Sequence, residues 1–342
     1  MPSQPPLPPL LTPYLSTFPQ SSLTLVTSIL DATGNWLVLR FLHAALSTSA
    51  SSNTAFGAEG LHNGTKKKVV FVSFVRSWEF WRTEAKRLGL DLARLADKQQ
   101  FAFIDGLSEL FYTPQAAHAT PGVSPAGLGS TPRAILPLRS QPGAVPGRLP
   151  APASTTEGGS TATPGQAELG IARKLHLYGR GTAALDALEK DIVSVIDQQR
   201  ASMAEDEELL LIVDQPDLLL AATGPSMGIG ATEMAEWHVH ATVLTLAADS
   251  PLIHNASTSG GHPAPPIETE HAAFTIGLAH RARSVLQLRN LETGAARDVS
   301  GVLRISRGGG WSTGEEDGLE EKDVLYFIQR DGGVRVFGRG ES

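Results

Sequence analysis

The residues best suited to chemistry lie in a turn between a predicted strand and a predicted helix, within Leu23–Leu46. A phosphate loop at such a turn has the pattern GxxxxGK followed by Ser or Thr. Its glycines let backbone N–H groups surround phosphates, its Lys contacts the β and γ oxygens, and its hydroxyl binds Mg²⁺. This turn has one Gly and no Lys, so we predict no cofactor. The degenerate Walker A loop comprises Asp31, Thr33, Gly34 and Asn35.

A second candidate residue ends the most apolar strand in the chain. The run Leu209–Val213 is followed by Asp214, as in a Walker B element, where the Asp orders Mg²⁺. The alternative is a structural Asp that pairs with neighbouring groups at the end of a buried strand. Without a Lys, a hydroxyl and a glycine cradle, Mg²⁺–nucleotide would lose most of its ligands. We therefore favour the structural role.

No other pattern indicates a catalytic or metal site. His238 and His240 are two residues apart, which on a helix points them to different sides, and His254, His262 and His271 lie in or beside a predicted loop. The chain has no Cys and no GxSxG elbow. We predict no metal site and no catalytic residue, and hence a protein that is not an enzyme.

Basic residues suggest contacts rather than chemistry. Lys66–Lys68 are interpreted as a solvated approach to a strand. Arginines near the C-terminus have few acids between them, which fits an edge that faces RNA or another subunit, although charged strand edges also prevent aggregation. The candidate contacts are Arg281, Arg283, Arg297, Arg304 and Arg307.

Composition limits the class of protein. The net charge of −7 over 342 residues argues against a protein whose main task is non-specific nucleic-acid binding. The absence of Cys fits a reducing compartment. The N-terminus has prolines and no basic region typical of a signal peptide, and no apolar run reaches the ~20 residues of a membrane helix. We expect a cytosolic protein, or one shared with the nucleus.

The predicted elements alternate between strand and helix, which indicates an α/β fold with a mostly parallel twisted sheet and helices on both faces. A hairpin around Arg330–Gly333 adds antiparallel strands at one edge. We predict a flexible lead-in over 1–20 and one domain over 21–340, interrupted by disordered insertions at about 113–168 and 249–267. The first insertion holds ten of the chain's 23 prolines.

Four stretches together resemble the Elongator complex protein 6 family. They are VVFVSFVRSWEFW (Val69–Trp81), LLLIVDQPDLLLAATG (Leu209–Gly224), RDVSGVLRIS (Arg297–Ser306) and VLYFIQRDGGVRVFGRG (Val324–Gly340). The resemblance covers roughly 23–112, 179–248 and 268–340, and leaves out both insertions. It implies a RecA-like domain with a degenerate P-loop NTPase fold.

The resemblance also implies a function. A member of this family would be a non-catalytic subunit of the Elongator complex. With Elongator subunits four and five it would form a hetero-hexameric ring that binds the catalytic subassembly and tRNA. The ring supports carboxymethyl-type modification of the wobble uridine, and ATP hydrolysis is attributed to the assembled ring.

In such rings the nucleotide edge of one subunit faces its neighbour. That would place the strand ends near Thr33, Ser77 and Asp214 at an interface. Trp36, Trp78 and Trp81 would then be assembly contacts, or simply core residues. Two other functions stay open on the residues alone: a divergent nucleotide-binding ATPase that uses Asp214, and a recombinase-paralog-like adaptor in DNA repair.

Overall fold

A computed structural model of the chain gives the arrangement of these elements. Residues 1–112 and 167–342 form one unit, to which all described residues belong. The first predicted insertion, 113–168, lies outside the described residues. The structure describes residues 7–16, 19, 22–47, 66–112, 171–223, 228–231, 234, 243–253, 265–291, 294, 296–311 and 319–338.

The described strands form one mixed sheet in the order β10-β9-β8-β7-β1-β6-β5-β2-β3-β4. Every pair from β7 to β4 is parallel, and β8, β9 and β10 continue the sheet in antiparallel pairs beyond β7. The strands are β1 (Thr24–Ser28), β2 (Lys66–Ser73), β3 (Phe101–Asp105), β4 (Ile171–Lys174), β5 (Glu207–Asp214), β6 (Val243–Ala247), β7 (Ser284–Arg289), β8 (Gly301–Arg307), β9 (Lys322–Ile328) and β10 (Val334–Phe337). This confirms the predicted parallel sheet with an antiparallel C-terminal edge, an arrangement consistent with a RecA-like fold.

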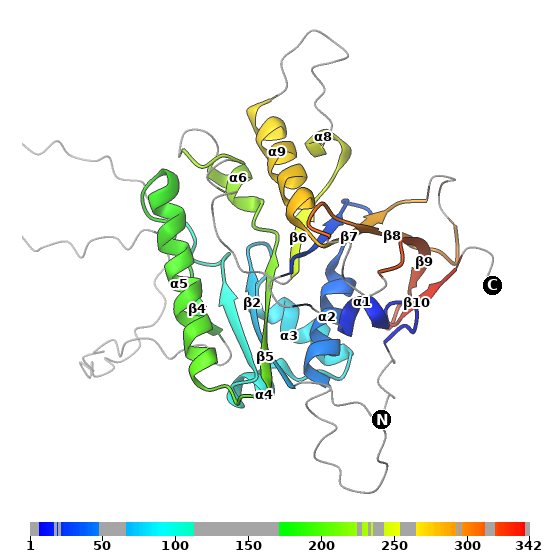
Figure 1. Cartoon of the computed structure of the whole chain (residues 1–342), viewed down its shortest axis with the longest axis horizontal. Helices are drawn as coiled ribbons and strands as arrows, with labels where there is room; N and C mark the ends of the chain where they lie inside the picture. The colour runs from blue at the N-terminus through cyan, green and yellow to red at the C-terminus, as the bar shows by residue number, and fades with distance from the viewer. Residues whose placement is uncertain are drawn as a thin grey trace, which may run out of the picture. The chain divides into compact units, whose positions relative to one another are not determined.

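Helices cover both faces of the sheet, and each face has its own apolar core (Figure 1). The first face carries α1 (Thr12–Ser16), α2 (Asn35–Ser47), α3 (Trp78–Arg87) and α4 (Leu92–Asp97). The second carries α5 (Gly181–Ala201), α6 (Leu218–Thr223) and α9 (Pro266–Arg281), and a short helix α8 (Ser250–Ile253) precedes α9. Two cores follow from central strands that are apolar on both sides.

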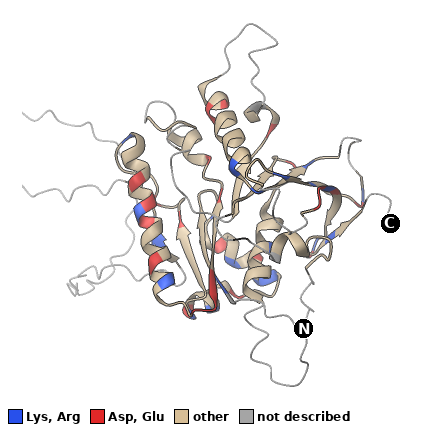
Figure 2. Cartoon of the chain, in the orientation of Figure 1, with Lys and Arg blue, Asp and Glu red and all other residues tan. Residues whose placement is uncertain are grey.

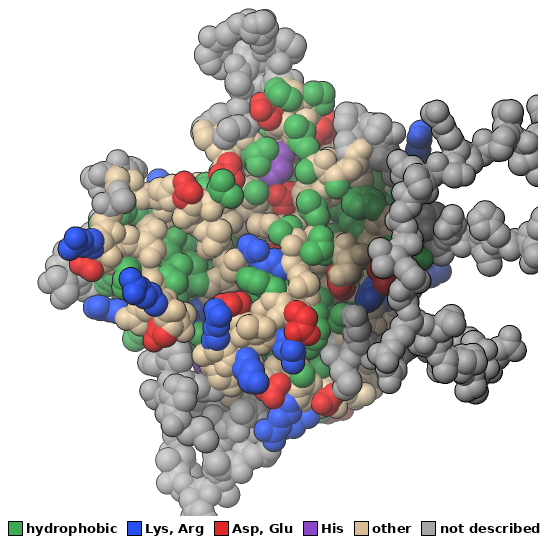
Figure 3. All heavy atoms as spheres, turned by 180° about the vertical axis from the view of Figure 1, so that it is seen from behind, with side chains coloured by type: hydrophobic (Ala, Val, Ile, Leu, Met, Phe, Trp, Pro, Cys, Tyr) green, Lys and Arg blue, Asp and Glu red, His purple; other side chains and the backbone are tan. Residues whose placement is uncertain are grey.

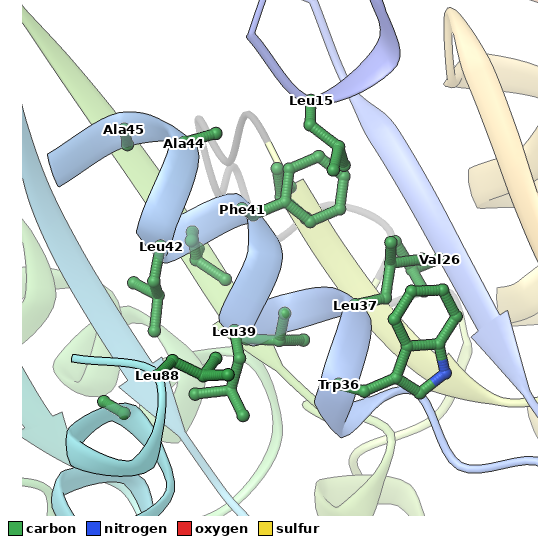
Figure 4. Packing of buried hydrophobic residues seen from close by; sticks show 14 of the residues in the cluster. Leu15, Val26, Trp36, Leu37, Leu39, Phe41, Leu42, Ala44, Ala45 and Leu88 are labelled. Carbon is green, nitrogen blue, oxygen red and sulfur yellow. The ribbon is translucent and has the colours of Figure 1, made fainter. Parts of the chain in front are cut away.

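The helix α2 is buried on more than one side, as its nearly continuous apolar sequence predicted. All of its residues from Trp36 to Leu46 are buried. Leu37 and Phe41 lie toward Val26 of β1 and Leu15 of α1, whereas Leu39 and Leu42 lie toward Leu88 (Figure 4). Such a helix is held by tertiary packing and does not depend on an amphipathic pattern.

The sequence places Ser77 and Asp91 where each can cap a helix, and the structure has both caps at the starts of α3 and α4. The Ser77 hydroxyl accepts a hydrogen bond from the Phe80 amide, and the Asp91 carboxylate accepts one from the Arg94 amide. Each cap satisfies a backbone donor that the first helical turn leaves free. Local sequence signals were therefore sufficient to fix where these two helices begin.

The prediction of a flexible lead-in over 1–20 was wrong for the part that the structure describes. Thr12–Ser16 form α1, and Leu11 and Leu15 are fully buried against the first core. The Tyr14 hydroxyl also donates a hydrogen bond of 2.9 Å to the Glu320 carbonyl. Prolines obscured this helix because its stability comes from packing on α2 and not from its five-residue sequence.

The lysines at the start of β2 are also not a solvated approach. They pair in register with the start of β5, where Lys67 contacts Glu208 and Lys68 contacts Glu207 at 3.6 Å. The Lys68 side chain is buried, and its ammonium donates to the Ser202 carbonyl and hydroxyl. Figure 2 shows the acidic start of β5 beside α5, whose exposed side carries residues of both signs.

The structure adds one strand that was not predicted, and it moves the bounds of the second insertion. The strand β4 begins at Ile171 at the edge of the sheet, and its four residues are half-buried or exposed, so no apolar run revealed it. Both ends of the predicted insertion 249–267 are helical, because Ser250–Ile253 form α8 and α9 begins at Pro266. Residues 254–264 lie outside the described residues.

The C-terminal end of α9 is closed by three successive glycines that follow β8. The amides of Gly309 and Gly310 donate to the Ala279 and Ala282 carbonyls, and a Cβ on Gly309 would overlap the His280 carbonyl oxygen. These bonds satisfy carbonyls that the last helical turn leaves without partners. Only residues without a side chain allow the backbone to approach this closely.

We therefore predict opposite effects for two Gly→Ala substitutions. Gly309→Ala should lower the free energy of unfolding by about 1–3 kcal/mol, because the new methyl group overlaps backbone. Gly277→Ala, inside α9 with open space around it, should raise it by roughly 0.5–1 kcal/mol. Urea denaturation of both variants measures this. Equal effects would show that the glycine cap does not constrain the loop.

Candidate functional site

The carboxylate of Asp214 lies at the carboxyl end of β5 and joins three adjacent strands. The Ser73 hydroxyl, at the end of β2, donates to one oxygen at 2.8 Å, and the Thr245 hydroxyl of β6 donates to the other at 2.8 Å. Asp214 is only 3% exposed. Both oxygens are therefore engaged with the protein in a site with almost no access for solvent.

Burial dominates the electrostatics of this carboxylate. It raises the pKa of Asp214, whereas the bonds from Ser73 and Thr245 and the charge of Arg76 act in the opposite direction. The Ser73 hydroxyl is itself held, because it accepts hydrogen bonds from the Trp81 indole and the Arg76 amide. This geometry favours the structural role for Asp214 over Mg²⁺ binding.

The turn between β1 and α2 folds tightly on itself. The Ala32 amide donates to the Ile29 carbonyl at 3.0 Å, and the Leu30 amide donates to the Asp249 carboxylate at 2.9 Å. Gly34 is buried, and its φ is not in the left-handed region. The Leu30 and Ala32 amides are thus used within the protein and are not free to bind a phosphate.

The four residues of the predicted degenerate loop have different surroundings. Asp31 and Thr33 are exposed at the turn, whereas Asn35 begins α2 half-buried. The carboxamide oxygen of Asn35 accepts a hydrogen bond of 2.8 Å from Arg76 Nε. The loop is therefore linked to Arg76, which follows β2 and whose charge lowers the pKa of Asp214.

Arg76 is the residue at this site that the sequence analysis missed. Its guanidinium donates a hydrogen bond to Asn35 and lies 4.8 Å from the centre of the Phe80 ring. It supplies a positive charge that is bonded to the turn at Asn35 and lowers the pKa of Asp214. The signal was an Arg directly after a buried strand and before the Ser77 cap.

A second buried polar pair lies nearby and was also missed. His271 Nε2 lies 3.0 Å from the carboxylate of Asp217, which also accepts a bond from the Ala247 amide. His271, which was expected in or beside a loop, belongs to α9 and is buried. The pair joins α6, the end of β6 and α9. Among the described residues, no three His, Cys, Asp or Glu side chains are grouped to hold a metal ion.

The three candidate tryptophans belong to the core. Trp81 is fully buried, and Trp36 and Trp78 are 7% and 5% exposed. Trp36 packs on Tyr326 of β9, while Trp78 packs on the rings of Phe101 and Phe103. All three side chains pack within the first core, so they are not exposed for contact with another subunit.

The five candidate arginines do not form one patch. Arg283 and Arg307 lie on the Trp311 ring, with guanidinium-to-centroid distances of 4.5 and 5.0 Å. Arg281 is exposed at the end of α9, Arg297 is exposed before β8, and Arg304 faces Asp323 across the β8–β9 pair. Seen from behind, basic and acidic side chains are interspersed (Figure 3). This face therefore lacks the single-sign surface typical of nucleic-acid binding.

None of the described helices is both long and apolar enough to cross a membrane.

Comparison with known proteins reveals a distant relationship. No family model matches the chain. It is 23% identical over 278 residues to Elongator complex protein 6 of Danio rerio and 24% identical over 280 residues to that of Xenopus tropicalis. Each match covers 80% of this chain and 81% of the relative.

The Xenopus laevis protein of the same name is 29% identical over 137 residues. That match covers 39% of this chain and spans less than half, 46%, of the relative. The chain is thus distantly related to proteins named Elongator complex protein 6, which suggests an Elongator subunit.

The structural role of Asp214 predicts that shape matters more than charge. Asp214→Asn keeps an acceptor for one hydroxyl and should change the free energy of unfolding by less than about 1 kcal/mol at neutral pH. Asp214→Ala leaves a cavity and two unpaired hydroxyls, and should cost about 2–4 kcal/mol. Urea denaturation measures both. The exposed Asp186 on α5 provides matched Asn and Ala controls, with little effect expected.

The pH dependence has a definite sign. Because burial raises the pKa of Asp214, ionisation weakens the folded state as pH rises above the ordinary value of 3.8. The stability of Asp214→Asn relative to the wild type should therefore increase as pH rises from that value. A decrease would mean that the ionised carboxylate stabilises the fold.

Proposed function

We propose that this chain is a non-catalytic subunit of the Elongator complex. In this proposal it forms a hetero-hexameric RecA-like ring with Elongator subunits four and five. The ring contacts the catalytic subassembly and tRNA, and supports carboxymethyl-type modification of the wobble uridine. We place the protein in the cytosol, or in both the cytosol and the nucleus. Any ATP hydrolysis belongs to the assembled ring.

One observation carries the proposal: the similarity to Elongator complex protein 6 extends over 80% of the chain in two relatives. A match of that extent includes residues of both cores and is not confined to one motif. The order of the strands, with β6 between β1 and β5, supports the RecA-like part of the proposal. Ring assembly and tRNA contact are the steps that need experiments.

The geometry of the turn supports the non-catalytic part. The Leu30 and Ala32 amides donate to Asp249 and Ile29, and the Asp214 carboxylate accepts two hydroxyl groups while buried. A nucleotide would have to displace these bonds and bring Mg²⁺ to a site that already contains the Arg76 charge. We infer that the degenerate P-loop has a structural role and does not bind a nucleotide.

The carboxyl end of the sheet is where we place a subunit contact. Leu30 is 79% exposed, the highest value among the exposed large hydrophobic residues, and Asp31 and Thr33 beside it are also exposed. A large apolar side chain that projects from a tight turn can be buried by a neighbouring subunit. In this proposal, the turn that binds a nucleotide in other P-loop proteins contacts a neighbouring subunit instead.

Co-expression with Elongator subunits four and five tests the assembly. Native mass spectrometry should show a hexamer that contains this chain, and cells without the chain should lose carboxymethyl-type uridine at the tRNA wobble position. Recovery of DNA-repair proteins in its place would favour a recombinase-paralog-like adaptor. Tight ATP–Mg²⁺ binding by the isolated chain, abolished by Asp214→Ala, would favour a divergent ATPase.

A single substitution at the turn tests the proposed contact. Leu30→Asp places a charge in the interface and should weaken assembly at least about tenfold, with no change in the stability of the isolated chain. Val193→Asp is the matched control, because Val193 is also exposed but lies on α5, away from the turn. Titration by mass photometry measures both. Equal assembly of the two variants would contradict this contact.

A further inference from the structure

One face of α2 contains a buried positive charge without a partner. Arg40 is 1% exposed, and none of its three guanidinium nitrogens has a hydrogen-bond acceptor. Arg side chains are almost never fully buried unless they are paired. Within the part of the chain that the structure describes, this is the one arginine whose whole guanidinium is buried and unpaired.

His43 lies one turn further along the same face of α2. It is 6% exposed, and its Nε2 atom also has no partner. The Ser47 hydroxyl gives its proton to the His43 carbonyl, so Nδ1 is the group that can donate to Ser47 Oγ, at 3.4 Å. Nε2 then carries a lone pair. Burial lowers the pKa of His43, and the charge of Arg40 lowers it further, which keeps the ring neutral.

The two side chains together present a specific set of groups. Arg40 offers several N–H donors and a full positive charge, and His43 offers one acceptor. Leaving a buried charge unpaired is strongly destabilising, whereas an anion with matched hydrogen bonds would offset that cost. A complementary ligand needs negative oxygens for the guanidinium and one O–H group for Nε2.

We propose that Arg40 and His43 form a binding site for inorganic phosphate. Its dianion at neutral pH has oxygens that accept from the guanidinium and one hydroxyl that donates to His43 Nε2. Sulfate has no proton at this pH, and a phosphate monoester is mostly without one, since its second pKa is about 6. The near-complete burial of both side chains also fits a small ion better than a polymer.

This inference is independent of the proposed function. It uses neither the β1–α2 turn nor any other subunit, because the site lies along the middle of α2. Phosphate bound only by the folded state would stabilise the isolated chain by mass action. Failure of the phosphate experiment would therefore leave the Elongator proposal untouched, and failure of ring assembly would leave the phosphate site untouched.

Thermal unfolding of the full chain tests the site. Phosphate is titrated at pH 7.5 against sulfate and chloride at matched ionic strength. The expected result is a saturable rise in melting temperature, about 5 °C at 100 times the dissociation constant, which is larger for phosphate than for sulfate. Arg40→Met, which has similar length without the charge, should abolish the rise and should melt higher than the wild type in phosphate-free buffer.

Arg87→Met is the matched control, because Arg87 is exposed on α3 and pairs with Glu84. It should keep the full phosphate response. Arg40→Lys, which keeps the charge without the guanidinium fork, should retain a reduced one. Because the wild-type titration needs no variant, the test does not depend on whether each variant folds.

Three outcomes would overturn the site. The first is a wild type with no saturable response to phosphate, or with an equal response to sulfate. The second is an undiminished response in Arg40→Met. The third concerns Glu59, the only acidic residue in the segment 48–65 that follows α2. In this outcome Glu59→Gln leaves the phosphate response unchanged but destabilises the chain, and Arg40→Met also destabilises it. Such a result would identify the Glu59 carboxylate, and not phosphate, as the acceptor of Arg40.

Discussion

The fold depends on a buried carboxylate that holds three parallel strands at one end. Asp214 accepts a hydroxyl from β2 on one side and a hydroxyl from β6 on the other. An ionised carboxylate is costly to bury, so the two bonds and the nearby charge of Arg76 are what make its position tolerable. Any change that separates these strands leaves three polar side chains without partners.

The opposite end of the same strands is held by a different interaction. Lys68 of β2 pairs with Glu207 of β5 and donates to Ser202, which follows α5. The β2–β5 pair is thus fixed by charge at its start and by a carboxylate–hydroxyl network at its end. Between them, apolar residues face both cores, so the polar groups determine register while burial supplies the driving force.

The same network occupies the carboxyl edge of the sheet. The edge is where parallel α/β sheets bind ligands, because loops and helix N-termini meet there. Here polar groups at that edge bond to one another, because Ser73 and Thr245 donate to Asp214. Arg76 donates to Asn35 and lowers the pKa of Asp214. Beside this network, Leu30 at the turn is exposed.

The sequence alone determined the fold class and the alternation of strands and helices, although it did not reveal α1 or β4. The apolar run before Asp214 located β5, and Ser77 and Asp91 marked two helix starts. The missing Lys excluded the ordinary phosphate-loop pattern. These signals are local, since each depends on residues within a turn or a strand of one another. The chemical identity of Asp214 was likewise visible, although its partners were not.

Tertiary structure decided which of these residues meet. The placement of β6 between β1 and β5 brings Thr245 to Asp214, and the docking of α9 brings His271 to Asp217. The same long-range packing buries α1 and Lys68, and leaves Arg40 without an acceptor in an apolar layer. Such pairings join residues far apart in the chain, so no local pattern specifies them, and only the folded arrangement does.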